Sequence, residues 1–468
     1  MNKTLLSVLT ATVCAGIGLQ AAPAEKAPVK PLPPVRMNGK AFFPIGVYDL
    51  ARSTVKQPER LGDVDPVLYD CGVNAAFFGN IGMPGDKRYP GYSHIVKAFE
   101  KAQKDPRFSN IALIISFDSR IYSENDPSLT GKARRKYRPL NAAEIEVRKK
   151  FLAEAMTFFA KQPNVIGYSV DEPENTFTNY FRIHHKGKDI NRIGFALNDW
   201  LGWFKPLIDR YHPGALQIPI IAWWGTYKDV APLYDILIAD QYPRGKGKNQ
   251  PEFSAGLYEV SFDAARAVDA ARNAGGGRTV IYMPPSFNNL KGNWTFPTRK
   301  ELRYLYFAPV TRGAMGIIAW RLNRCKQPYR ETVVYPTLKE LSRFHDYYLG
   351  TWHDELVSSN HDEATVDYLK KFATRDELLN DVKIGKKKVV ADFVPDVTYC
   401  LRRKADGQWM LLAVNNRRDA LDVAFTVKSK MPATVKEELS GKTVKVAGKV
   451  IKDKFGPFDV KVYTWSEK

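Results

Sequence analysis

The chain has 468 residues, of which 44% are hydrophobic, and 70 lysines and arginines against 50 acidic residues give it a net charge of +20. This length and composition are typical of a soluble globular protein with one large domain and a smaller one. The basic balance would permit nucleic-acid binding, but the lysines and arginines are spread along the chain. We therefore expect weak attraction to acidic polysaccharide and no nucleic-acid recognition.

The first 22 residues have the pattern of a signal peptide. Lys3 supplies a positive charge, residues 5–19 form an apolar core, and Ala21 and Ala22 offer small residues for cleavage. That core is too short to span a bilayer, so we expect a protein exported to the periplasm or beyond the cell, with no integral membrane segment after cleavage. Residues 23–34 are rich in proline and are predicted to form a linker.

Three cysteines remain after cleavage: Cys71, Cys325 and Cys400. Because they are odd in number and widely spaced, we expect buried free thiols rather than a disulfide framework or a metal cluster. His184 and His185 are neighbours in sequence and cannot form a convergent metal site alone. The sequence therefore predicts no metal and no cofactor.

Strand-like and helix-like stretches alternate eight times within residues 35–352. The predicted strands are residues 42–49, 74–79, 110–118, 165–171, 217–224, 235–241, 279–284 and 316–322. Between them lie amphipathic stretches of helical length, for example 142–162, 193–211, 253–274 and 298–312. This alternation predicts an α/β fold, a closed (β/α)8 TIM barrel. An open doubly wound sheet is the competing topology, but no glycine-rich phosphate loop follows any of the strands.

The last part of the chain changes character. Residues 353–468 contain short alternating segments with turn signals between them, namely 408–415, 421–428, 443–446 and 459–465. This pattern predicts a C-terminal antiparallel β-sandwich domain. Such a domain could bind glycan or brace the barrel.

Polar and aromatic residues follow the predicted strands at the carboxyl ends, where a barrel gathers its active residues. They are Tyr48, Asp118, Asp171, Glu172, Trp223, Trp224, Asp240, Tyr242, Trp320, Arg321 and Asn323. Aromatic rings stack on the apolar faces of sugars, while carboxylates and amides bind the hydroxyl groups. The set therefore predicts a sugar-binding pocket.

Asp171 and Glu172 end the fourth predicted strand, and Pro173 follows them. Side chains alternate along a strand, so Asp171 shares a face with Ser169, and Glu172 can join it in one cavity only if the chain bends. A partly buried glutamate beside another carboxylate suits the proton donor in glycoside cleavage, because its pKa rises toward neutrality. Alternatively, the two acids begin a loop or cap the next helix.

Three features together resemble secreted glycoside hydrolases with a (β/α)8 catalytic barrel. They are the segment VRMNGKAFFPIGVY at residues 35–48, the Asp171-Glu172-Pro173 tip and the sandwich-like tail. The acid pair is similar to that of the retaining β-N-acetylhexosaminidases that use substrate assistance. The resemblance implies that Asp171 orients the 2-acetamido group of the sugar and that Glu172 acts first as acid and then as base.

The same resemblance implies that Tyr242 hydrogen-bonds the acetamido oxygen and that Trp320 forms the floor of the sugar site. The seventh predicted strand ends without a carboxylate at residues 282–287, which fits a substrate that supplies its own nucleophile. Two alternatives remain. One is a β-galactosidase-like retaining enzyme whose second acid is Asp240 or Asp118, and the other is an exported glycan-binding barrel without catalysis. Each of the three takes an oligosaccharide or a glycoprotein glycan as its partner.

Overall fold

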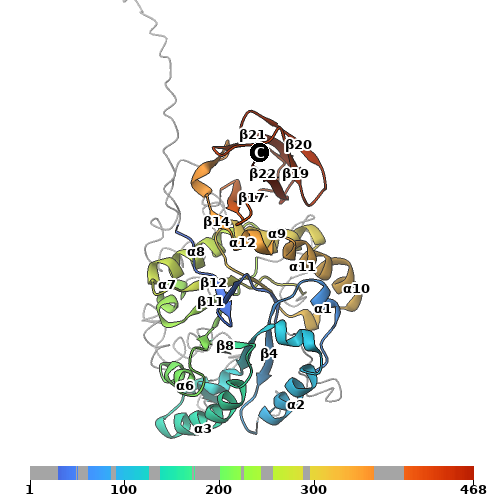
Figure 1. Ribbon diagram of the computed structural model, residues 1–468. Coiled ribbons are helices and arrows are strands. Elements are labelled where there is room, and N and C mark those ends of the chain that lie inside the picture. The colour runs from blue at the N-terminus through green and yellow to red at the C-terminus, as the bar shows by residue number, and fades with distance from the viewer. Residues whose placement is uncertain are drawn as a thin grey trace, which may run out of the picture.

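The computed structural model describes residues 30–48, 50, 62–85, 91–125, 137–170, 173, 201–222, 226–243, 257–287, 296–362 and 395–467. Figure 1 shows a barrel of strands and helices and, above it, a β-domain formed by the C-terminal part of the chain. A hairpin precedes the barrel, in which β1 (Val35–Met37) pairs antiparallel with β2 (Lys40–Phe42). Its turn residues Asn38 and Gly39 both have positive φ, as the tight turn of such a hairpin requires. Leu32, within the predicted linker, is buried against the barrel core.

Parallel strands form the barrel wall. They are β3 (Ile45–Val47), β4 (Ala75–Ile81), β5 (Ala112–Phe117), β8 (Val165–Val170), β9 (Leu216–Gln217), β10 (Ile220–Ile221), β11 (Ile236–Ala239), β12 (Thr279–Tyr282) and β13 (Ile317–Ala319). β9 and β10 are two halves of one strand, interrupted at Pro219, which has no N–H to donate. β9 pairs with β8, β10 pairs with β11, and β13 pairs with β3, so eight strands close into a ring. The predicted (β/α)8 barrel is confirmed.

Helices cover the outside of this ring (Figure 1). They are α1 (Val67–Asp70), α2 (Tyr92–Ala102), α3 (Ala142–Phe159), α6 (Phe204–Tyr211), α7 (Tyr227–Val230), α8 (Glu259–Ala274), α9 (Arg299–Thr311), α10 (Gln327–Tyr329), α11 (Tyr335–Ser342) and α12 (His345–Tyr348). A small hairpin, β6 (Ser123–Asn125) with β7 (Tyr137–Pro139), follows β5. Asn141 at α3 and Thr298 at α9 each form a capping box with the glutamate three residues on, which fixes where both helices begin.

The C-terminal domain is entirely antiparallel. Its strands are β14 (Thr351–Trp352), β15 (Val357–Ser359), β16 (Val397–Arg403), β17 (Gln408–Asn415), β18 (Leu421–Val427), β19 (Thr434–Glu437), β20 (Thr443–Ala447), β21 (Val450–Phe455) and β22 (Val460–Ser466). β20 pairs with both β19 and β21 and so connects the two halves. Buried side chains from both halves, including Leu411, Phe425 and Tyr463, form one core between them. The predicted β-sandwich is confirmed.

The sandwich shares a second apolar layer with the barrel. Along β17, Leu411 and Ala413 belong to the sandwich core, whereas Met410, Leu412 and Val414 belong to the barrel cluster, as alternation along a strand dictates. Helix α9 lies under this face and contacts β16, β17 and β22 (Figure 1). The barrel therefore supports the face of the sandwich formed by β16, β17 and β22.

Cys71, Cys325 and Cys400 are buried free thiols, as predicted. Burial raises the pKa of the Cys71 thiol to about 11 and that of the Cys400 thiol to about 12, so both stay protonated near neutral pH. No helix in the described part of the chain is both long and apolar enough to cross a bilayer.

Candidate functional site

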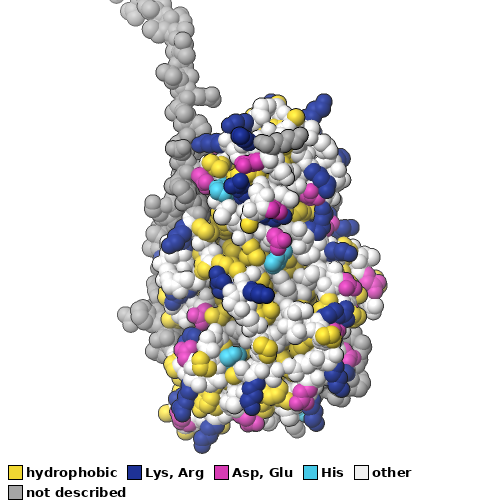
Figure 2. All heavy atoms as spheres, in the orientation of Figure 1, with side chains coloured by type: hydrophobic (Ala, Val, Ile, Leu, Met, Phe, Trp, Pro, Cys, Tyr) yellow, Lys and Arg dark blue, Asp and Glu magenta, His cyan; other side chains and the backbone are white. Residues whose placement is uncertain are grey.

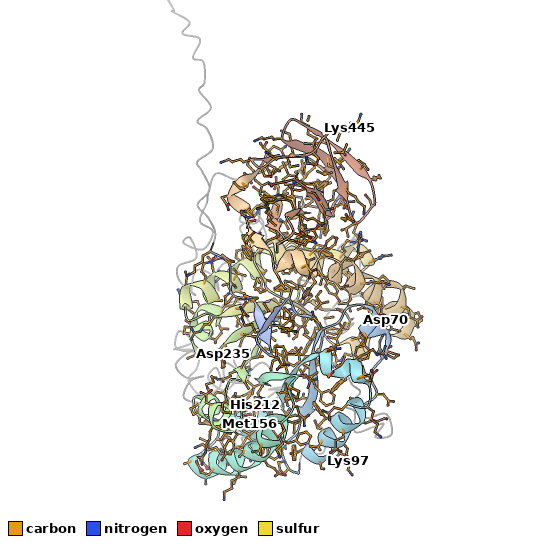
Figure 3. The ribbon with its side chains drawn as sticks, viewed as in Figure 1. Asp70, Lys97, Met156, His212, Asp235 and Lys445 are labelled. Carbon is orange, nitrogen blue, oxygen red and sulfur yellow. The ribbon has the colours of Figure 1, made fainter. Side chains whose placement is uncertain are left out.

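The register of β5 and β8 shows which side chains point into the barrel. Tyr168 points outward, because its hydroxyl lies 2.8 Å from Nδ1 of His212 beyond the end of helix α6 (Figure 3). Ser169 therefore points inward. Ser116 pairs with Ser169, so Ser116 and Asp118, two residues further on, share the inward face. Asp118 is 4% exposed and its carboxylate accepts a hydrogen bond from the backbone N–H of Arg120 at 3.1 Å.

Asp240 points inward from the end of β11 by the same reasoning. Ala239 pairs with Tyr282, whose hydroxyl faces Asp263 on helix α8 outside the barrel wall. Asp240, the next residue, therefore faces the interior, and it is 2% exposed. Its N–H donates to the carbonyl of Ile221 at 2.9 Å, which extends the parallel ladder by one residue. Two buried aspartates thus lie on the inward face at the carboxyl end of the barrel.

Three aromatic rings form a cluster at the same end, which we call the aromatic base: Tyr48, Phe77 and Trp320. The N–H of Tyr48 donates to the carbonyl of Ala319, so Tyr48 and Trp320 continue neighbouring strands. Their ring centroids are 4.0 Å apart, and Trp320 is only 2% exposed. The guanidinium carbon of Arg321 lies 4.7 Å from the centre of the Trp320 ring. Trp320 is therefore covered by Tyr48 and Arg321.

Tyr242 is accessible to solvent, with 39% of its surface exposed, unlike the buried Asp240 and Trp320. Its hydroxyl donates to Oδ2 of Asp240 at 3.4 Å. Its ring stands nearly perpendicular to that of Phe287, with 5.9 Å between the centroids. The end of β11 therefore presents a tyrosine hydroxyl whose direction is set by a buried carboxylate and an aromatic neighbour.

The end of β13 turns sharply. Arg321 has the left-handed backbone conformation, with φ 57° and ψ 53°, and it precedes a 3-10 turn at Leu322–Arg324 that leaves Asn323 exposed. A non-glycine residue in this conformation is strained, and such strain is concentrated at functional sites. The conformation lets the Arg321 side chain fold back over Trp320.

A buried polar cluster lies behind β11 and β12, and sequence reasoning missed it. Asp263 on α8 is 4% exposed and accepts a hydrogen bond from the hydroxyl of Tyr227 at 3.1 Å. Tyr282 also faces Asp263 and donates to the carbonyl of Gln241 at 3.4 Å. The cluster thus connects helix α8 to the segment between Asp240 and Tyr242. The sequence did contain a signal for this cluster, because Asp263 is an acidic residue among the apolar residues that α8 buries.

Four predicted site residues lie outside the described residues: Asp171, Glu172, Trp223 and Trp224. Seven lie within them. The structure brings Tyr48, Asp118, Asp240, Tyr242, Trp320, Arg321 and Asn323 to the carboxyl ends of the strands. Among the described residues no group of three or more histidines, cysteines or acids could hold a metal ion.

A cavity of about 650 Å³ opens at the opposite end of the barrel. Its wall includes the β1–β2 hairpin and the first residues of several strands, such as Val165, Leu216 and Thr279. In barrels of this type the amino ends of the strands serve stability, whereas the carboxyl ends carry the chemistry. This cavity is therefore separate from the candidate site.

No protein-family model and no curated protein matches the chain. Solved structures do. A GH27 β-L-arabinopyranosidase from Geobacillus stearothermophilus is 10% identical with a TM-score of 0.52, and the match covers 91% of this chain and 97% of that one. A maltogenic α-amylase from Thermotoga neapolitana is 10% identical with a TM-score of 0.50, covering 90% and 98%. The chain shares their fold. The likeness extends over the barrel and the C-terminal domain together.

Proposed function

We propose that the protein is a glycoside hydrolase. The observation that supports this most directly is the carboxyl end of the barrel, where Asp118, Asp240 and Tyr242 lie at the same end as the aromatic base. Carboxylates, a partly exposed tyrosine and aromatic rings are the groups that bind and cleave sugars. The two solved structures of the same fold are an arabinopyranosidase and an α-amylase, which supports the same class of reaction.

We propose further that the substrate is a 2-acetamido sugar of an oligosaccharide or glycoprotein glycan. Glu172 donates a proton to the glycosidic oxygen while the acetamido oxygen attacks the anomeric carbon and the leaving group departs. Glu172 then removes a proton from the water that opens the cyclic intermediate, so the configuration at the anomeric carbon is retained. Asp171 orients the acetamido group and Tyr242 donates to its oxygen. The exposure of Tyr242 supports this last role, in which its hydroxyl proton turns from Asp240 to the acetamido oxygen when the sugar binds.

A two-carboxylate mechanism is the alternative that the buried aspartates favour. Asp118 and Asp240 both point inward. In this mechanism one of them attacks the anomeric carbon as the nucleophile, while Glu172 acts as the acid and then as the base. This mechanism needs no acetamido group on the substrate. It therefore predicts a different substrate preference from substrate assistance.

A pair of aryl glycosides that differ only at carbon 2 separates the two mechanisms. With substrate assistance, the 2-acetamido glycoside is cleaved, the 2-hydroxy glycoside is a poor substrate, and a thiazoline mimic of the cyclic intermediate inhibits. Comparable cleavage of the 2-hydroxy glycoside would favour two protein carboxylates. Binding of glycans without cleavage of any would instead indicate a barrel that has lost catalysis.

The role of Glu172 is tested by Glu172→Gln, with Glu146→Gln on the exposed side of α3 as the matched control. Because positioned acid catalysis contributes about 10² to 10⁴ in rate, Glu172→Gln should lower kcat by that factor while the control keeps the wild-type value. A folded Glu172→Gln protein with wild-type kcat would remove Glu172 from the mechanism.

Export is part of the proposal, since residues 1–22 have the features of a signal peptide. Expression of the full chain in a bacterial host should deliver a protein outside the cytoplasm whose amino-terminal sequence begins near residue 23. Recovery of the intact chain from the cytoplasm alone would contradict export.

A further inference from the structure

The outer surface of the sandwich carries exposed lysines whose charge is not offset by an ion pair. We define the lysine face as Lys445, Lys452 and Lys454, which lie on β20 and β21. Within the described part of the chain, none of these three side chains forms an ion pair. Lys445 lies at the end of the sandwich far from the barrel (Figure 3), and Figure 2 shows lysine and arginine side chains projecting around this domain.

The strand register places these lysines on one side of the sheet. Val446 pairs with Ile451, and Ile451 is buried in the sandwich core. Lys452 and Lys454 therefore alternate with buried residues and face outward. Continuing the register by one residue brings Lys445 beside Lys452. Neighbouring lysines on this face are thus roughly 5 to 7 Å apart at the backbone, by the spacing of strands and of alternate residues.

The carboxylates of this part of the chain are engaged elsewhere. Glu437 accepts hydrogen bonds from backbone N–H groups, Glu438 pairs with Arg343 of the barrel at 2.8 Å, and Asp453 pairs with Lys461. Asp422 stands opposite Lys454 in the register and offsets that lysine in part. The positive charge of the lysine face is therefore left largely uncompensated by the sandwich itself.

Like charges side by side on a sheet lower the stability of the fold. Local arrangements that oppose stability are expected where function requires them. All three lysines are exposed, so burial in the core does not explain their presence. An anionic partner outside the chain would relieve the repulsion.

We propose that the lysine face binds an acidic polysaccharide. The choice of a glycan rests on the proposed function, but binding to this face does not require catalysis. Single-stranded nucleic acids bind through exposed aromatic rings as well as charge. The exposed large hydrophobic residues among the described ones are Val67, Val147 and Tyr242, and none belongs to the sandwich. A carbohydrate polyanion, which binds through charge alone, therefore fits this face better.

The test uses dextran sulfate and uncharged dextran, which differ in the sulfate groups, with the full mature protein. Lys445→Gln/Lys452→Gln removes two charges from the lysine face. The matched control, Lys97→Gln/Lys104→Gln, removes two from exposed lysines around helix α2 at the opposite end of the molecule (Figure 3). Affinity is measured by titration at two salt concentrations, and hydrolysis of a small uncharged aryl glycoside is measured alongside.

We expect binding to dextran sulfate that weakens with salt and no binding to dextran. The lysine-face variant should bind about 25-fold more weakly, because each of the two lysines near an anionic surface contributes about fivefold, and the control should bind within about twofold of wild type. Equal weakening in both variants, or stronger binding to an oligothymidylate than to dextran sulfate, would overturn the proposal. Hydrolysis should be unchanged in the lysine-face variant, so failure of binding and failure of the proposed function are read separately.

Discussion

Asp263 is a carboxyl group buried in the helix layer behind the candidate site. Burial raises its pKa to about 7, against the opposing effect of hydrogen bonds from Tyr227 and Tyr282 and of the charge on Arg266. The folded protein therefore keeps a proton that the unfolded chain releases near pH 4. Stability from this group is present at low pH and is lost as pH rises toward 7.

Asp263→Asn should remove this dependence, because the amide does not titrate and can still accept from Tyr227. Between pH 5 and pH 8 the wild type should lose on the order of 2 kcal/mol of unfolding free energy relative to the variant. Chemical denaturation at several pH values measures the difference, with Asp209→Asn on the exposed side of α6 as control. If the unfolding free energies of wild type and Asp263→Asn depend on pH in the same way, the pKa of Asp263 does not differ between the folded and unfolded states.

The expectation that site residues follow the carboxyl ends of the strands predicted the position of some side chains but not the contacts of others. Asp118, Asp240 and Trp320 directly follow buried strands, so their location at the carboxyl end was predictable from the sequence. Two contacts were not: Arg321, whose backbone is left-handed, lies over Trp320, and Tyr242 meets Phe287 from a different strand. Both depend on loop geometry that hydrophobic pattern does not encode.

At the scale of elements, helix α9 depends on its N-cap residue, Thr298. The Thr298 hydroxyl accepts from the N–H of Glu301 at 3.2 Å, and the buried Glu301 carboxylate accepts in return from the N–H of Thr298 at 2.8 Å. Thr298→Ala should cost about 1 kcal/mol, the usual effect of losing an N-cap. Thr298→Ser keeps the hydroxyl and should cost much less. Thermal unfolding of the two variants makes the comparison, and equal losses would mean that the cap contributes little.

The elements themselves were largely predictable. Every predicted barrel strand overlaps an observed one, because each is an apolar run bounded by turn residues. In the sandwich the predicted segments match β17, β18, β20 and β22, whereas β14, β15, β16, β19 and β21 were missed. Three of these, β14, β15 and β19, have only two to four residues, which are too few to show an alternation. Residues 335–342 and 345–348 form two short helices, α11 and α12, rather than one.

At the scale of the molecule, polar contacts reinforce the apolar layer between barrel and sandwich. The hydroxyl of Tyr304 on α9 donates to Oδ1 of buried Asn416 at 2.7 Å, and the hydroxyl of Thr311 donates to that of Thr398 at 2.9 Å. Removing the sandwich would expose the face of α9 that contacts β17, and it would leave the hydroxyl groups of Tyr304 and Thr311 without these partners. The sequence predicted the two parts but not this junction, since the contacts join residues about a hundred positions apart.

Because the two parts share one buried layer, they should unfold in a single calorimetric transition rather than in two. Tyr304→Phe keeps the ring contact with Phe458 but leaves Asn416 Oδ1 without its donor. The variant should lose about 1 to 3 kcal/mol, and the whole transition should move to lower temperature. Tyr211→Phe, a half-buried tyrosine on α6 away from the junction, serves as the control. If Tyr304→Phe instead splits the transition, or shifts a separate sandwich transition alone, the barrel and the sandwich are stabilised independently, and the layer around α9 is a contact rather than a common core.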